Sequence, residues 1–181
     1  MDTAVYAAPL MSLWSLYEGW ERIHRRLLDG VSELDPESLA LSHAESWPVW
    51  ALAAHIGGAR VYWLCGVLKE PGRETTPFGA LDAEGWEDHP ERPRSAEELV
   101  RALETSWAIV ESCLGRWTPP MLAERFERRF GDQIQWHTRS SVLTRLMTHD
   151  AYHTGEISLT LGSNGLPAMD PWDRPPPPPR G

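Results

Sequence analysis

Apolar residues recur at steps of three and four along four segments of the chain, and this spacing predicts amphipathic helices. The first segment covers residues 10–28, and we expect it to end before Gly30. The second begins at Ser46 or Trp47 and ends before Pro71, because proline cannot continue a helix.

The third and fourth helices have clearer limits. Ser95 and Glu98 have the spacing of a capping box, so the third helix is expected to start there and to stop near Gly115. The fourth is expected over residues 138–161, followed by glycines that end it. Residues 121–137 are ambiguous, since RRFGDQIQWHT also fits a turn between two short extended pieces. Four long helices without a convincing set of strands predict an all-α fold, an antiparallel four-helix bundle.

Two stretches lie outside the helical pattern. Residues 70–94 are rich in glycine, proline and charge, and we expect a long connection between the second and third helices that covers the mouth of a site. The C-terminal sequence PWDRPPPPPRG is typical of a polyproline segment that cannot build a core. The expected organisation is a helical domain over residues 1–165 and a proline-rich tail over residues 166–181.

Composition narrows the class of partner. The chain has 181 residues, with 17 basic against 26 acidic side chains and a formal net charge of −9, which disfavours nucleic acid as a ligand. No apolar run approaches the roughly 20 residues that a membrane span needs. The two cysteines form no CxxC pair, which indicates a reducing compartment. We therefore expect a soluble, cytoplasmic protein that acts on a small molecule, without nucleic acid or membrane.

Histidines carry the candidate chemistry. His149 and His153 are four residues apart and share a helix face with Val142 and Leu146, so they lie on the apolar stripe. Burying an unpaired imidazole costs on the order of 1–3 kcal/mol, so a shared partner is expected. His55 lies on an inward face of the second predicted helix. Three imidazoles from two helices can hold a divalent metal with one position open, although satisfied core histidines explain the same pattern.

Other side chains would complete such a site. Asp150 and Glu156 are the nearest carboxylates in sequence and could orient the imidazole ligands, and Glu156 shares the stripe of His153. The candidates for pocket walls, for which core packing is the alternative role of the aromatic residues, are Trp50, Tyr62, Trp136, His137, Arg145 and Tyr152.

Two strings resemble segments of the DinB-like (DinB/YfiT) superfamily. WPVWALAAHIGGARVYWL is similar to its second helix, and LTRLMTHDAYHTGEISLTLGSNGLPAMDPWD is similar to its last helix and exit. The resemblance implies a four-helix bundle, often a homodimer, with a zinc- or nickel-type divalent site at His55, His149 and His153. Arg145 stands where relatives often carry another histidine, and it would either bind an anionic substrate group or face solvent.

The same resemblance implies a reaction. Relatives include mycothiol-dependent maleylpyruvate isomerase and the bacillithiol- or mycothiol-dependent S-transferases, in which the metal activates a low-molecular-weight thiol that attacks an electrophile. The leading hypothesis is therefore a metal-dependent thiol transferase. A metal-dependent hydrolase and a helical bundle that binds a small ligand without catalysis are the alternatives, so the sequence leaves enzymatic activity open.

Overall fold

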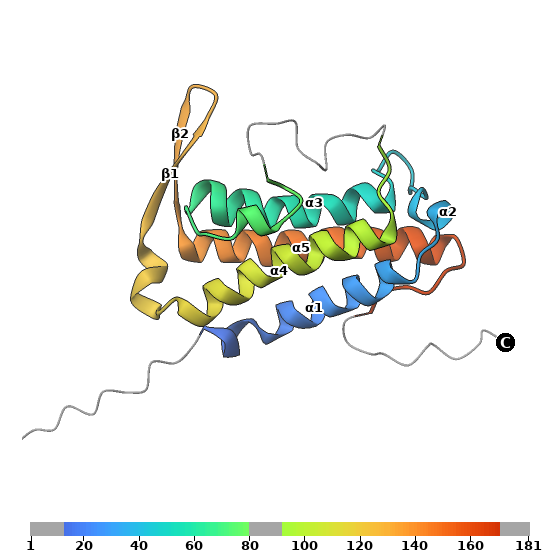
Figure 1. Ribbon diagram of the computed structural model, residues 1–181, viewed down its shortest axis with the longest axis horizontal. Helices are drawn as coiled ribbons and strands as arrows, with labels where there is room; N and C mark the ends of the chain where they lie inside the picture. The colour runs from blue at the N-terminus through green and yellow to red at the C-terminus, as the bar shows by residue number, and fades with distance from the viewer. Residues whose placement is uncertain (1–12, 80–91, 171–181) are drawn as a thin grey trace, which may run out of the picture.

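The computed structural model describes residues 13–79 and 92–170, which form a mostly helical fold with one small hairpin (Figure 1). The α-helices are α1 (Trp14–Ser32), α2 (Pro36–Leu39), α3 (Val49–Val61), α4 (Ala96–Arg116) and α5 (Arg139–Ser163). The shorter elements are a π-helical stretch η1 (Tyr62–Val67) that continues α3, the 3-10 turns η2 (Arg73–Thr75) and η3 (Pro119–Ala123), and the strands β1 (Arg125–Phe130) and β2 (Gln133–Thr138).

Within these residues the four long helices lie side by side, because α1 and α3 each pack against both α4 and α5 (Figure 1). Their apolar stripes bury two clusters of side chains, and one of these contains the fully buried Trp20 and Trp117. None of these helices combines the length and the apolarity that crossing a membrane would require.

The central helix α3 is buried almost all round. Eleven of its 13 residues are buried, and the two exceptions are His55 and Ala59, which stand four positions apart on one edge. The half-exposed Tyr62 continues this edge into η1. The edge of α3 beside α5 is therefore where a solute can reach the helix.

Gly30 does not interrupt the first helix, so that expectation is wrong. It lies inside α1, where a Cβ atom would come within 2.4 Å of the Met169 side chain. The glycine is needed for this close approach rather than for a break. Residues 166–170 thus return across the helices, and the hydroxyl of Ser158 accepts a hydrogen bond from the Met169 amide at 2.9 Å.

Helices α4 and α5 each begin at a capping box. Ser95 and Glu98 form the predicted capping box, in which each side chain bonds the other residue's amide, and α4 begins directly after it. Thr138 and Ser141 cap α5 in the same way.

The expectation of an all-α fold needs one correction, since β1 and β2 pair as an antiparallel hairpin that extends from one end of the helices (Figure 1). Gly131, with a φ of 56°, occupies the left-handed conformation in its turn. The ambiguous segment is thus two short extended pieces. Every residue of the two strands keeps some exposure, so neither strand places a buried face against the helices.

The connection from α3 to α4 packs its first part against the helices. Phe78 is buried, and its ring would lie 3.0 Å from a Cβ atom at Gly57. The space beside this glycine is therefore filled by the Phe78 ring. Residues 80–91 of the expected cover and residues 171–181 of the tail lie outside the described residues.

Candidate metal centre

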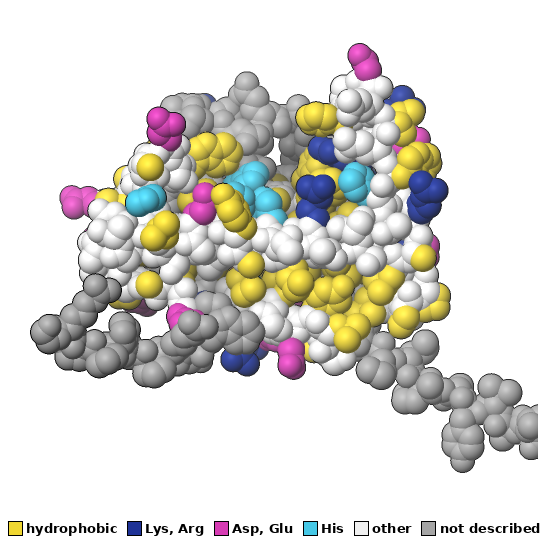
Figure 2. All heavy atoms as spheres, turned by 180° about the vertical axis from the view of Figure 1, so that it is seen from behind, with side chains coloured by type: hydrophobic (Ala, Val, Ile, Leu, Met, Phe, Trp, Pro, Cys, Tyr) yellow, Lys and Arg dark blue, Asp and Glu magenta, His cyan; other side chains and the backbone are white. Residues whose placement is uncertain are grey.

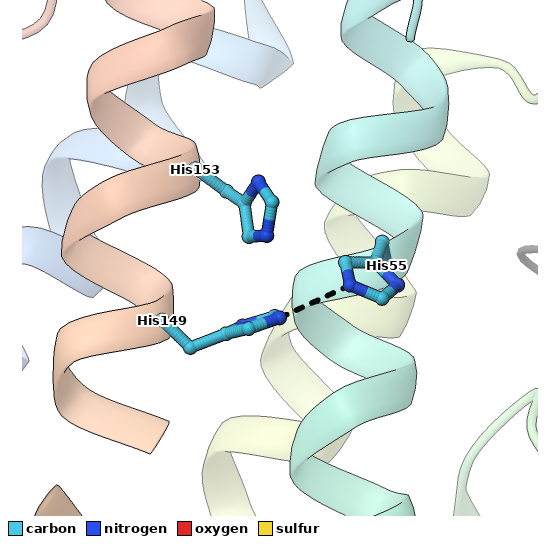
Figure 3. Close-up of side chains that lie close together, drawn as sticks. All are labelled: His55, His149 and His153. Carbon is cyan, nitrogen blue, oxygen red and sulfur yellow. Dashed lines mark hydrogen bonds between the residues drawn. The ribbon is translucent and has the colours of Figure 1, made fainter. Parts of the chain in front are cut away.

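Three histidine rings from two helices converge on one point. His55 projects from α3, and His149 and His153 project from successive turns of α5 into the gap between the helices (Figure 3). The Nε2 atoms of His55 and His149 are 3.0 Å apart, and one ring nitrogen from each of the three histidines lies within 4.8 Å of the other two. Within residues 13–79 and 92–170 this is the one group of three potential metal ligands of this kind.

Glu156 sets the orientation of the His153 ring. Its carboxylate lies 2.6 Å from His153 Nδ1, one helical turn along α5, so the Nδ1 hydrogen is donated to it and Nε2 is left with its lone pair. Burial lowers the pKa of His153, and the hydrogen bond that the ring donates to Glu156 offsets this only in part. A lowered pKa favours the neutral ring, which is the form that binds a metal.

Asp150 lies beneath the cluster and is fully buried. Its Oδ2 atom accepts hydrogen bonds from Trp20 Nε1 at 2.6 Å and from Arg60 Nε at 2.9 Å. Its Oδ1 atom is 3.9 Å from His149 Nδ1, and neither atom has a hydrogen-bond partner among the described residues. A small rotation of the His149 ring would pair these two atoms.

Arg60 belongs to a polar network inside the helices. Its guanidinium forms an ion pair with Asp150 in which both side chains have no solvent exposure, and it approaches His24 Nδ1 at 3.4 Å. His24 stacks on Trp107 with ring centroids 4.5 Å apart and is buried among the helices. Burial and the neighbouring charge of Arg60 lower the pKa of His24 to about 2.

The predicted pocket residues do not all lie together. Tyr152 is exposed and packs edge-on against His153 at 5.0 Å, whereas Trp50 is buried among core residues away from solvent. Trp136 projects from the hairpin face opposite to that of its neighbour His137, because successive strand residues alternate. The remaining candidates gather at the base of the hairpin around the ring of Trp63: Tyr62, His137 and Arg145.

Two contributors were missed from the sequence. Trp47, which is 48% exposed, packs edge-on against His55 with ring centroids 5.3 Å apart and covers one side of the cluster. Arg128 from β1 joins Tyr62 and Trp63. Trp47 lies two residues before the observed start of α3, and Arg128 lies in the segment that the sequence left ambiguous, so helical periodicity gave no signal for either.

The geometry fits a metal ion. Imidazole nitrogens bind zinc at about 2.0–2.1 Å, which places tetrahedral ligands about 3.3 Å apart. The 3.0 Å separation of two Nε2 atoms is close to that distance, and the third ring nitrogen lies within 4.8 Å of them, so it would have to move inward to complete the set. All three histidines are partly exposed to solvent.

Comparison with known proteins agrees with this fold. The family model of the DinB superfamily matches residues 19–157, and the chain belongs to this superfamily. The structure is similar to that of a DinB-like protein from Bacillus cereus ATCC 10987, with a TM-score of 0.63 at 19% sequence identity. This similarity covers 84% of this chain and 93% of that chain, and at such identity it supports the fold alone. No match is found among curated proteins.

Proposed function

We propose that the protein binds a divalent metal, zinc or nickel, through His55, His149 and His153, and transfers a low-molecular-weight thiol to an electrophilic small molecule. The observation that carries this proposal is the convergence of three ring nitrogens within 4.8 Å at a half-exposed position between α3 and α5. Imidazole ligands suit both metals. Bacillithiol and mycothiol are the thiols that the family resemblance suggests.

The surrounding residues would prepare the ligands. Glu156 holds His153 in the tautomer whose Nε2 faces the cluster. Asp150, anchored by Arg60 and Trp20, offers its remaining oxygen to His149 Nδ1 once that ring turns toward the metal. Each of the two proposed ligands on α5 thus has a carboxylate near its Nδ1 atom.

A divalent ion held by the three histidines would lower the pKa of a thiol bound at its fourth coordination position, which favours the thiolate at neutral pH. In the transfer the thiol sulfur bonds to the electrophilic carbon, the leaving group departs with the electron pair of its broken bond, and the thiol proton passes to water. Trp47 and Tyr152 flank the cluster and would shield this step from part of the solvent.

Elemental analysis of the purified protein tests the metal. Wild type should carry about one divalent ion per chain, as structural and catalytic histidine sites do. His153→Ala should lose it, whereas His43→Ala, which removes an exposed histidine outside the cluster, should retain it. Equal metal content in wild type and His153→Ala would refute the proposed centre.

Turnover assays test the chemistry. A halonitroarene should be consumed by the metal-loaded protein only when a small thiol is present, and His153→Ala should abolish the reaction. Hydrolysis of a chromogenic ester without thiol would instead assign the hydrolase alternative. A metal-loaded protein without either activity would leave a binding function.

A further inference from the structure

A second cluster of polar side chains surrounds the Trp63 ring at the base of the hairpin. The guanidinium carbon of Arg128 is 5.0 Å from the ring centroid, and that of Arg145 is 4.6 Å from it. The His137 ring packs edge-on against the same indole at 4.8 Å. Two permanent cations and an imidazole thus meet on one aromatic platform.

The fold explains why these residues meet. In the hairpin register Arg128 faces Gln135 and Phe126 faces His137, so the arginine and the histidine lie on the same side of the two strands. Arg145 lies two turns into α5, and Trp63 lies at the start of η1. Four separate elements therefore contribute to one surface.

The two arginines have no acidic counterion among residues 13–79 and 92–170. Arg128 donates to the Tyr62 hydroxyl at 2.9 Å and to Gln135 Oε1 at 2.8 Å, both of which are neutral acceptors. Arg145 is exposed and lies over the Trp63 ring. Arg139, in contrast, pairs with two carboxylates nearby. Positive charge is therefore concentrated here in a chain whose formal net charge is −9.

His137 adds an unsatisfied polar atom to this surface. Its Nε2 is buried and has no hydrogen-bond partner among the described residues. Burial and the charges of Arg145 and Arg128 lower the pKa of His137, which is consistent with both cations acting on the same small volume. Buried polar atoms without partners are rare in native proteins, so a ligand oxygen is a reasonable partner.

The cluster lies next to the candidate metal centre. Arg145 is one helical turn before His149 on α5, which corresponds to about 6 Å along the helix axis. On the facing helix, the exposed edge runs from His55 through Ala59 to Tyr62. Figure 2 shows the basic side chains and a histidine at the base of the hairpin, across a recess from the histidines nearer the middle of the molecule.

We propose that Arg128, Arg145 and His137 form a carboxylate-binding subsite. This subsite would hold the anionic end of a small molecule. The other end of that molecule would react at the histidine cluster, and this second statement rests on the proposed function. Guanidinium groups bind carboxylates through paired hydrogen bonds.

Calorimetric titration with benzoate tests the subsite, with the neutral amide benzamide as a matched ligand. Wild type should bind benzoate at least about tenfold more tightly than benzamide, the difference expected from one charge-assisted hydrogen-bonded pair. Arg145→Gln, which changes an exposed residue, and Arg128→Gln should each remove most of that preference. Arg129→Gln is the control, because Arg129 is the next residue on β1, projects from the other hairpin face and pairs with Glu127.

Three outcomes would overturn the subsite. The first is equal affinity for benzoate and benzamide. The second is an equal loss of the benzoate preference in Arg129→Gln and Arg145→Gln. The third is a higher affinity for phenyl phosphate than for benzoate, which would assign a phosphate ester as the ligand instead. His153→Ala separates this proposal from the metal. The benzoate preference should survive in that variant, and its loss would mean that benzoate binds the metal rather than the arginines. A wild-type protein that lacks metal but keeps the preference would refute only the proposed function.

Discussion

The buried histidine His24 should make stability fall steeply in mild acid. Its pKa is lowered from 6.5 to about 2 because the ring is buried and lies beside Arg60. The unfolded chain takes up a proton near pH 6.5, whereas the folded chain does not, so the contribution is complete above the unfolded pKa and declines as the pH falls below it. From about pH 7.5 to about pH 5 the free energy of unfolding should fall by about 2 kcal/mol through this residue alone.

The substitution His24→Gln isolates this effect, since a glutamine oxygen can still accept a hydrogen bond from Arg60 and does not titrate. Urea denaturation of metal-free wild type and variant at both pH values gives the difference in acid sensitivity. His43→Gln makes the same chemical change at an exposed position and should leave the acid sensitivity of wild type unaltered. If His24→Gln loses as much stability in acid as wild type, within about 0.5 kcal/mol, the reasoning about buried charge is wrong.

Two further substitutions test the buried ion pairs. Asp150→Asn leaves the fully buried Arg60 without its counterion, so the free energy of unfolding measured by urea denaturation should fall by about 3–5 kcal/mol. The metal content should fall as well. A loss of stability below about 1 kcal/mol would contradict the importance of this ion pair. Glu70 accepts hydrogen bonds from Arg116 and Arg139, and although burial alone would raise its pKa, these bonds hold it below its usual range. Glu70→Gln should therefore cost about 2 kcal/mol at neutral pH and reduce the loss of stability on acidification, and unchanged unfolding curves would argue against this role.

The helix positions and the shared face of His149 and His153 were the parts of the structure that the sequence predicted best. The capping box of Ser95 and Glu98 is a local signal, and local hydrogen bonds give the same result in any tertiary context. His149 and His153 share a face by helix geometry alone. The meeting of His55 with that pair depended on which edge of α3 faces α5, and periodicity cannot decide this for a helix buried on nearly every side.

Other features depend on tertiary contacts that no local pattern reports. Arg60 lies in an apolar-looking helix, and its burial follows only from its partner Asp150, which is 90 residues away. Trp136 and His137 are adjacent in sequence, yet strand alternation places only the histidine beside Trp63. The reason for a glycine at position 30 is its close contact with Met169, which lies in the segment after α5.

The wide turn η1 limits what length changes this region can accept. Because Tyr62–Val67 is π-helical and the Glu70 amide bonds back to the Leu64 carbonyl at 2.9 Å, the chain leaves α3 in a direction that carries Glu70 to Arg116 and Arg139. Deleting one residue would wind the stretch back to an ordinary helix and swing everything after it by about 100° around the axis. The number of residues between α3 and Glu70 is thus constrained as tightly as the chemical identity of those residues. A homologous chain with a shorter η1 would have to anchor the segment that follows it by other contacts.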